Sequence, residues 1–144
     1  MRTLVDTNVI LDILLERDEF FQDSYSVIKL ATEGAITVLI PAGGISDIYY
    51  IIRRSGKDAS AAHSSIRALL QLVEACDTAA SDIMAALHLR MADLEDAILA
   101  ATAKREKVDF IITRNEHDFL NSPVAAISPK AFLSQFDAVS ASSS

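Results

Sequence analysis

Two aspartates follow apolar runs that read as buried strands, one directly and one in the next loop, and carboxylates in such positions can hold a metal ion. Asp6 comes after the run over residues 2–5, and Asp118 lies in the loop after the run over residues 108–113. In an open α/β sheet, ligands bind beyond the carboxyl ends of the strands, so both carboxylates are expected at that edge. A carboxylate just past a strand is held by rigid backbone, which suits metal coordination.

Further acids are expected on helices. Asp93 and Asp96 are three residues apart at the start of a helical segment over residues 94–105, so both can lie on one side of its first turn. An acid there also complements the helix dipole and caps free amides, and this reading is at least as good as a functional one for Asp93. Asp96 lies beside an apolar face, which favours function. Asp47 borders the apolar stripe of a helix over residues 46–54, either at a rim or directed into a cleft.

These carboxylates, taken as a group, predict a site for a hard divalent cation. Mg²⁺ and Mn²⁺ prefer oxygen ligands and keep several waters, whereas without metal the like charges would raise one another's pKa values. One metal ion, or two about 4 Å apart, would activate water for attack on a phosphodiester. Zinc is not expected, because the histidines have no metal-ligand spacing: His63, His88 and His117.

Short apolar runs alternate with helical patterns, which predicts an α/β fold with a parallel sheet covered on both faces. Strands are expected over residues 2–5, 36–40, 108–113 and 124–127. Helices are expected from Thr7, over residues 21–33, 46–54, 60–74, 80–88 and 94–105, and from Pro129. A single domain is expected over residues 1–138, followed by a disordered tail over residues 139–144.

Composition narrows the possible classes of protein. A chain of 144 residues, 51% of them hydrophobic, suits one domain. The net charge of −7 argues against binding nucleic acid by bulk attraction alone, but a bound metal would supply positive charge locally. One cysteine, Cys76, excludes an internal disulfide. No apolar run reaches the roughly 20 residues of a membrane span and no secretory signal is visible, so a cytoplasmic protein is expected.

Cations near the expected site are candidates for substrate contacts. Arg114 is adjacent to the proposed metal ligands and is the better candidate. Arg53 and Arg54 end a helix that also carries Tyr49 and Tyr50, which suggests phosphate pairing beside base stacking. The alternative is a helix with a half-buried face and a solvated basic end.

Four segments in this order and spacing resemble the PIN-domain family: LVDTNVILDIL, DIYYIIRR, DLEDAILAATA and FIITRNEHDF. The resemblance runs from about residue 2 to residue 136. It implies a three-layer α/β/α sandwich and a metal-dependent endoribonuclease acting on single-stranded RNA. Many small bacterial members are VapC-like toxins, commonly homodimeric and neutralised by a small antitoxin protein, so the resemblance also implies these partners.

The resemblance places the family's four acids, as catalytic residues and ligands for Mg²⁺ or Mn²⁺, on Asp6, Asp47, Asp96 and Asp118. It places Asn8 and Thr113 where relatives hold carboxylates or metal-bound water by hydrogen bonds, and Asn115 where many relatives have an acid. The second acid is usually Glu in the better-described toxins, one methylene longer than the Asp in this chain. A neutral residue at the position of Asn115 leaves open whether one metal binds or two.

Three other functions compete with this interpretation. A phosphatase of the haloacid-dehalogenase class needs a second aspartate two residues after the first, where this chain has Asn8. No glycine-rich phosphate loop follows the first strand, which disfavours a nucleotide-binding enzyme. A catalytically weak or inactive module that binds nucleic acid or protein stays open, because of the departures at Asp47 and Asn115. Metal binding that disappears in Asp6→Asn would favour the enzyme.

Overall fold

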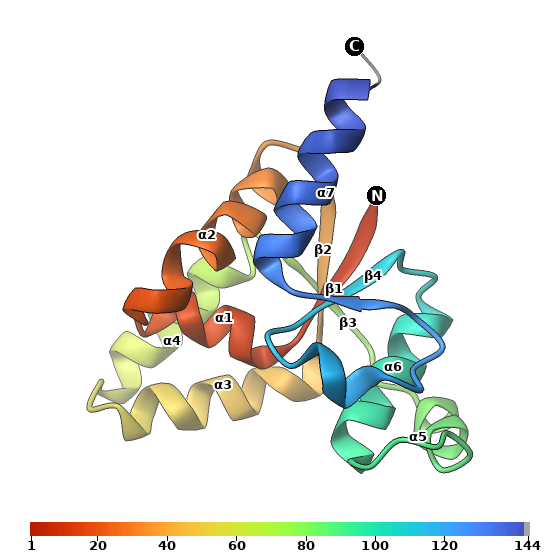
Figure 1. The fold of residues 1–144 in the computed structure, drawn as a ribbon. Helices are drawn as coiled ribbons and strands as arrows, with labels where there is room; N and C mark the ends of the chain where they lie inside the picture. The colour runs from red at the N-terminus through yellow and green to blue at the C-terminus, as the bar shows by residue number, and fades with distance from the viewer. Residues whose placement is uncertain (143–144) are drawn as a thin grey trace.

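The computed structural model describes residues 1–142, which form a parallel sheet between two layers of helices (Figure 1). The strands are β1 (Arg2–Val5), β2 (Thr37–Pro41), β3 (Glu74–Cys76), β4 (Phe110–Ile112) and β5 (Ala126–Ile127). The helices are α1 (Thr7–Leu14), α2 (Asp18–Thr32), α3 (Ala42–Arg54), α4 (Ala59–Leu69), α5 (Ala80–Ala86), α6 (Leu94–Arg105) and α7 (Pro129–Ser142), with the 3-10 helix η1 (Glu116–Phe119) after β4. The predicted α/β class and its three layers are confirmed.

The order of the strands places a crevice beside β1. The five strands are arranged β3-β2-β1-β4-β5 and all of the pairings are parallel. Leu4 of β1 is in register with Leu39 of β2 on one side and with Ile111 of β4 on the other. The chain therefore builds outward in one direction through β3 and then returns to build outward in the other. Ligand sites of open α/β sheets lie at such a reversal, beyond the carboxyl ends of the strands.

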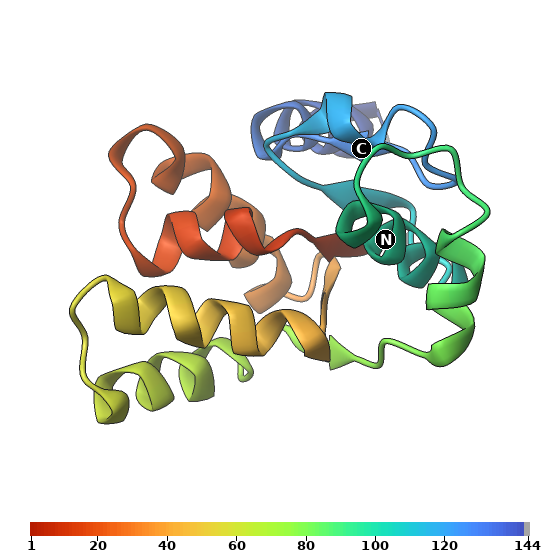
Figure 2. The same cartoon turned by 90° about the horizontal axis from the view of Figure 1, so that it is seen from below.

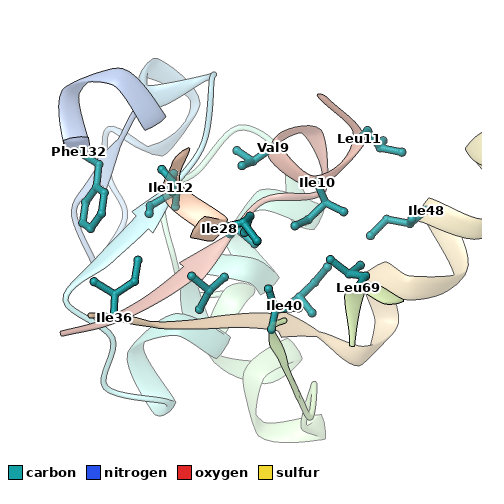
Figure 3. Close-up of a cluster of buried hydrophobic side chains, with 14 of the residues drawn as sticks. Val9, Ile10, Leu11, Ile28, Ile36, Ile40, Ile48, Leu69, Ile112 and Phe132 are labelled. Carbon is teal, nitrogen blue, oxygen red and sulfur yellow. The ribbon is translucent and has the colours of Figure 1, made fainter. Parts of the chain in front are cut away.

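Alternate side chains of the strands enter two separate cores. Val5 and Ile112 lie in the larger core, whereas their neighbours Leu4 and Ile111 lie in the smaller one, as the two-residue period of a strand requires. Figure 3 shows the larger core, in which buried side chains of α1, α2, α3, α4 and α7 meet the sheet. The smaller core lies under α6, whose Ala100 and Ala103 are fully buried. The alanines let α6 lie close to the sheet.

Helices α3 and α4 pack on each other and extend away from the sheet, as the yellow and yellow-green helices of Figure 2 show. The turn between them contains Gly56, whose φ of 108° lies in the region that favours glycine. The first turn of α3 approaches α1 closely, because a methyl group at Gly44 would lie 3.1 Å from Cγ2 of Thr7. Among the described helices, none combines the length and apolarity needed to cross a membrane.

Apart from shifts of up to four residues at the ends of elements and the unexpected η1, two parts of the chain differ from the sequence-based expectation. The helix expected over residues 60–74 ends at Leu69, and Glu74–Cys76 forms the edge strand β3. Only Cys76 of this strand is buried, so its three residues carry almost no periodic signal. Helix α7 continues to Ser142 and so occupies residues 139–142 of the expected disordered tail. The remainder of that tail, residues 143–144, lies outside the described residues.

Candidate functional site

A cavity of about 220 Å³ lies beyond the carboxyl ends of β1 and β2, with acids from three elements in its wall. Asp6 comes from the end of β1, Asp47 from α3, and Glu95 and Asp96 from the first turn of α6. The structure thus brings together three of the four aspartates that the sequence singles out. In the described part of the chain, no basic side chain lies within 4.0 Å of the carboxylates in this wall, which are those of Asp6, Asp47, Glu95 and Asp96.

Asp6 is held by the strand next to its own. Its backbone N–H donates to the carbonyl of Ile112 at 2.9 Å, which continues the pairing of β1 with β4. Its carboxylate Oδ2 accepts a hydrogen bond of 2.9 Å from Oγ1 of Thr113. Burial raises the pKa of Asp6, although the hydrogen bond from Thr113 acts in the opposite direction. The proton is therefore held more tightly here than by a carboxyl in water.

Asn8 extends this network and leaves one acceptor without a donor. Its Nδ2 lies 3.4 Å from Oδ2 of Asp6 and 3.5 Å from Oγ1 of Thr113. Its Oδ1 is buried and accepts no hydrogen bond. A buried acceptor without a partner is costly, so Oδ1 is suited to receive a donor such as a water molecule held by a cation. Asn8 and Thr113 thus both contact the carboxylate of Asp6, and the supporting role that the resemblance implies for them stays a prediction.

The start of α6 gathers negative charge. Burial and the charge of Asp6, followed by the charges of Asp93, Asp118 and Glu95, raise the pKa of Asp96 to about 6. Burial and the charge of Asp47 similarly raise the pKa of Glu95. These shifts are what like charges do when they meet without a counter-ion.

The neighbours of Asp96 divide into a cap and a candidate ligand. Oδ2 of Asp93 accepts a hydrogen bond of 3.0 Å from the backbone N–H of Asp96, so Asp93 caps the helix and lies outside the cavity wall. Glu95 lies in the wall, and sequence reasoning missed it. The signal was its place directly between two acids that were considered, in the segment DLEDAILAATA.

Asp47 reaches the cavity because α3 begins so close to α1. Gly43 and Gly44 line the cavity one turn before Asp47, and both lack the Cβ that would fill this corner. Asp47 is exposed on its helix, so its carboxylate faces solvent and the open side of the cavity. The shorter Asp in place of Glu therefore stands at the rim.

Asp118 and Asn115 lie outside the cavity wall. Asp118 belongs to η1 and is exposed, with Nε2 of His117 at 3.2 Å from its Oδ1. Its charge is still near enough to contribute to the raised pKa of Asp96. Asn115 is exposed and donates its backbone N–H to Oγ1 of Thr113 at 3.1 Å. The fourth acidic position is thus at the periphery.

Arg114 is occupied within the fold. Its Nε forms an ion pair with Oδ2 of Asp12 at 2.9 Å, although the N–H does not make a hydrogen bond there. Its guanidinium lies 4.1 Å from the ring centre of Phe20. Asp12 is fully buried and also accepts from Oγ of Ser24 at 3.2 Å. This partner was missed because it lies on α1, far from Arg114 in the sequence.

Arg53 and Arg54 are exposed at the end of α3, more than a helical turn beyond the cavity residue Asp47.

A divalent cation fits the cavity in charge and in donor type. All of the side-chain donors at its acidic wall are oxygens, the carboxylates repel one another, and an acceptor on Asn8 is unused. Among the described residues, however, no three His, Cys, Asp or Glu side chains are close enough to hold an ion as they stand. An ion bound here would have to draw the carboxylates toward it. The ligands it would use are Asp6, Asp96 and, from the rim, Asp47, Glu95 or Asp118.

The fold and the site together define the class of this protein. It is an α/β protein with a parallel sheet and an acidic cavity at the point where the strand order reverses. The chain belongs to the PIN domain family, whose model matches residues 2–117. The match ends before Asp118, the peripheral acid.

Known proteins of similar sequence or structure cover between 76% and 94% of the chain. Ribonuclease VapC1 of Aquifex aeolicus (strain VF5) is 23% identical over 141 residues, which cover 94% of this chain and 96% of that protein. The structure of VapBC2 from Rickettsia felis, bound to a DNA fragment from its promoter, matches with a TM-score of 0.70 at 18% identity, covering 89% of this chain and 98% of the other. VapC20 of Mycobacterium tuberculosis, a toxin that cleaves the sarcin-ricin loop, matches with a TM-score of 0.59 at 16% identity, covering 76% and 86%.

Proposed function

We propose that this protein is an endoribonuclease that uses Mg²⁺ or Mn²⁺ to hydrolyse phosphodiester bonds of single-stranded RNA. The observation that carries the proposal is the acidic cavity, in which Asp6, Asp47, Glu95 and Asp96 meet with no basic side chain of the described residues within 4.0 Å. Membership of the PIN domain family and the similarity to a protein named a ribonuclease support it. Carboxylates that lie close together raise one another's pKa values, and such a group is typical of a site that binds a cation.

Some residues of the site would bind the metal ion, and others would orient the carboxylates that bind it. Asp6 and Asp96 are the central ligands, and Thr113 and Asn8 fix the carboxylate of Asp6 by the contacts at its Oδ2. Bound Mg²⁺ or Mn²⁺ would supply positive charge for the phosphate and an activated water for the attack. Oδ1 of Asn8 has no donor among the described residues and would be available to receive a hydrogen bond from a water molecule beside Asp6.

The biological setting that we propose is a toxin neutralised by an antitoxin protein. One solved structure of similar fold is a toxin–antitoxin complex from Klebsiella pneumoniae, and another is VapBC2 of Rickettsia felis bound to promoter DNA. A homodimer is proposed on the same family resemblance. Size-exclusion chromatography with light scattering tests the dimer, and a single mass near the 15.6 kDa of one chain would contradict it.

The nuclease is tested with a panel of labelled single-stranded RNAs incubated with Mg²⁺, Mn²⁺ or EDTA. Wild-type protein is expected to cut in metal and not in EDTA, and Asp6→Asn to lose at least about 10²-fold in rate because it removes a central ligand. The matched control is Asp137→Asn, the same chemical change at an exposed position of α7. Equal cutting by Asp6→Asn and the control would reject the proposed site.

The second candidate is a module that binds nucleic acid or protein without catalysis. The specific observation in its favour is that no three candidate ligands among the described residues stand close enough to chelate an ion. Titration of Mn²⁺ followed by calorimetry separates the two. Binding of Mn²⁺ that is lost in Asp6→Asn supports the enzyme, whereas tight RNA binding in EDTA with no Mn²⁺ binding and no cutting supports the module.

A further inference from the structure

One face of α3 connects the acidic cavity with the outer end of the helix. Gly43, Asp47, Tyr50 and Arg54 are spaced by four, three and four residues, so they form a single row along the helix. Gly43 and Asp47 line the cavity, and Tyr50 and Arg54 continue the same row outward. From Asp47 to Arg54 the row extends about 10 Å along the helix axis. A ligand leaving the cavity along this face would meet Tyr50 first and Arg54 next.

The two outer residues of this row are not used by the fold. Tyr50 is 69% exposed, whereas its neighbour Tyr49 is partly buried, with its ring centre 5.4 Å from that of His63. Arg54 is exposed, and no carboxylate in the described part of the chain lies within 4.0 Å of its guanidinium. One exposed tyrosine is ordinary in itself. Its position between the cavity and an unpaired arginine is what distinguishes it.

The charge of this region is opposite to that of the molecule. Residues 48–72, the outer part of the α3–α4 pair, contain four basic residues and one acid: Arg53, Arg54, Lys57, Arg67 and Asp58. The whole chain carries a net charge of −7. A polyanion repelled elsewhere on the surface is therefore attracted to these two helices.

We propose that single-stranded RNA extends from the acidic cavity along this face of α3, with a base stacked on Tyr50 and a phosphate paired with Arg54. An aromatic ring and a neighbouring arginine are the combination with which proteins bind single strands without reading their sequence. This inference rests on the proposed ribonuclease function, and it specifies the direction in which the substrate leaves the site. It also separates the two arginines, because Arg53 lies about 100° around the helix axis from Arg54.

The inference is tested by the binding of fluorescently labelled RNA oligonucleotides of increasing length, measured by anisotropy in EDTA so that no cutting occurs. Wild-type affinity is expected to rise once the RNA is long enough to reach Tyr50 and Arg54. Tyr50→Ala should lower the affinity for long RNA by about 10-fold and Tyr50→Phe should retain it, because the phenyl ring still stacks. Arg54→Ala should reduce the dependence of log affinity on log salt concentration by about 0.7, the value for one phosphate contact on a single strand.

Arg53→Ala is the matched control, since it removes the same charge from the same helix end but lies off the row. It should change the affinity by less than about two-fold, whereas diffuse attraction to the whole basic region would make the two arginine variants equal. Equal effects of Arg53→Ala and Arg54→Ala, or an unchanged affinity of Tyr50→Ala, would overturn the proposal.

Binding in EDTA also keeps this inference separate from the proposed chemistry. If long RNA binds through Tyr50 and Arg54 but is not cut in Mg²⁺ or Mn²⁺, the surface is correct and the nuclease is wrong. If RNA is cut in metal but Tyr50→Ala and Arg54→Ala bind as wild type does, the nuclease is correct and the surface is wrong. Circular dichroism of each variant checks that these exposed substitutions leave the fold intact.

Discussion

Asp82 and Asp96 lie on the adjacent helices α5 and α6, and their surroundings shift their pKa values in opposite directions. Asp82 is 2% exposed and accepts hydrogen bonds from Nε of Arg105 at 2.8 Å, from Oγ1 of Thr102 at 3.1 Å and from the backbone N–H of Ala79 at 2.8 Å. Burial raises the pKa of Asp82, but these bonds, led by that from Arg105, outweigh it and leave the pKa lowered. Asp96 is partly buried, but its carboxylate has no comparable hydrogen-bond donors among the described residues, and its pKa rises to about 6.

The difference separates a carboxylate that holds the fold from one kept for a ligand. The α5–α6 contact shows that this chain can satisfy a buried acid completely, with a guanidinium, a hydroxyl and an amide. At the cavity, 14 residues after Asp82 in the sequence, the carboxylate of Asp96 is left facing other acids. A protein under selection for stability alone would remove such repulsion. The unsatisfied acids therefore point to a function.

The largest expected effect on stability comes from breaking the satisfied site. Asp82→Ala removes the acceptor of three buried or half-buried donors and should lower the free energy of unfolding by about 3 kcal/mol. Urea denaturation followed by circular dichroism measures it, with Asp137→Ala as the exposed control. A loss below about 1 kcal/mol would mean that Asp82 is not the structural acid described here.

Bound metal should stabilise the protein through the acidic cavity and not through Asp82. At a Mn²⁺ concentration about 100 times its dissociation constant, binding to the native state adds about 2.7 kcal/mol of stability, so the melting temperature should rise. The rise should disappear in Asp6→Asn and persist in Asp137→Asn. Thermal melts with Mn²⁺ and with EDTA test this, and an equal rise in both variants would place the ion elsewhere.

Acid should weaken the contribution of Asp82. Because its pKa is lowered in the folded state, this contribution is present above the unfolded value near 3.8 and is lost as pH falls through the folded value. One such group changes stability by at most about 1.4 kcal/mol per pH unit. Urea titrations of wild type and Asp82→Ala should therefore converge on acidification. A difference that stays constant to the onset of acid unfolding would contradict this origin.

The smallest effect has the opposite sign. In EDTA at pH 7, Asp96→Asn should stabilise the protein by roughly 1 kcal/mol, because the charged form of this half-buried group is disfavoured and solvent screens part of the repulsion. Because the pKa of Asp96 is raised in the folded state, the wild-type protein becomes less stable relative to Asp96→Asn as pH rises from about 4 to 6. The two proteins should therefore be equally stable at pH 4. Destabilisation by Asp96→Asn at pH 7 would mean that this acid is structural too.

The sequence predicted the elements whose signals are local. Residues 2–5 and 94–105 were expected as a strand and a helix and are observed as Arg2–Val5 and Leu94–Arg105. The second of these is bounded by the N-cap Asp93 and by basic residues in its last turn, which the sequence displays. The edge strand Glu74–Cys76 could not be found in this way, because its order comes from pairing with β2.

The site residues, too, were predicted where their signal is local and missed where it depends on contacts between distant segments. Asp6 was found from its position after a strand, which is a local pattern. Glu95 was missed because only the packing of α3 against the sheet brings Asp47 near it, and its raised pKa reflects that neighbour. Arg114 was expected to contact substrate from adjacency alone, but its partner Asp12 lies on another element and is invisible in the sequence. Contacts between distant segments decide which of the plausible residues are free.

The pairing of β1 with β4 also fixes the moment at which the site can exist. The hydrogen bond from Thr113 to Asp6 joins residues 107 positions apart, whereas β1 and β2 pair much earlier along the chain. Domains generally fold as units, and pairings between segments far apart in the sequence form slowly. A nascent chain thus carries Asp6 for most of its synthesis without the strand that holds its carboxylate. The cavity is therefore complete only after β4 has been synthesised and has paired with β1.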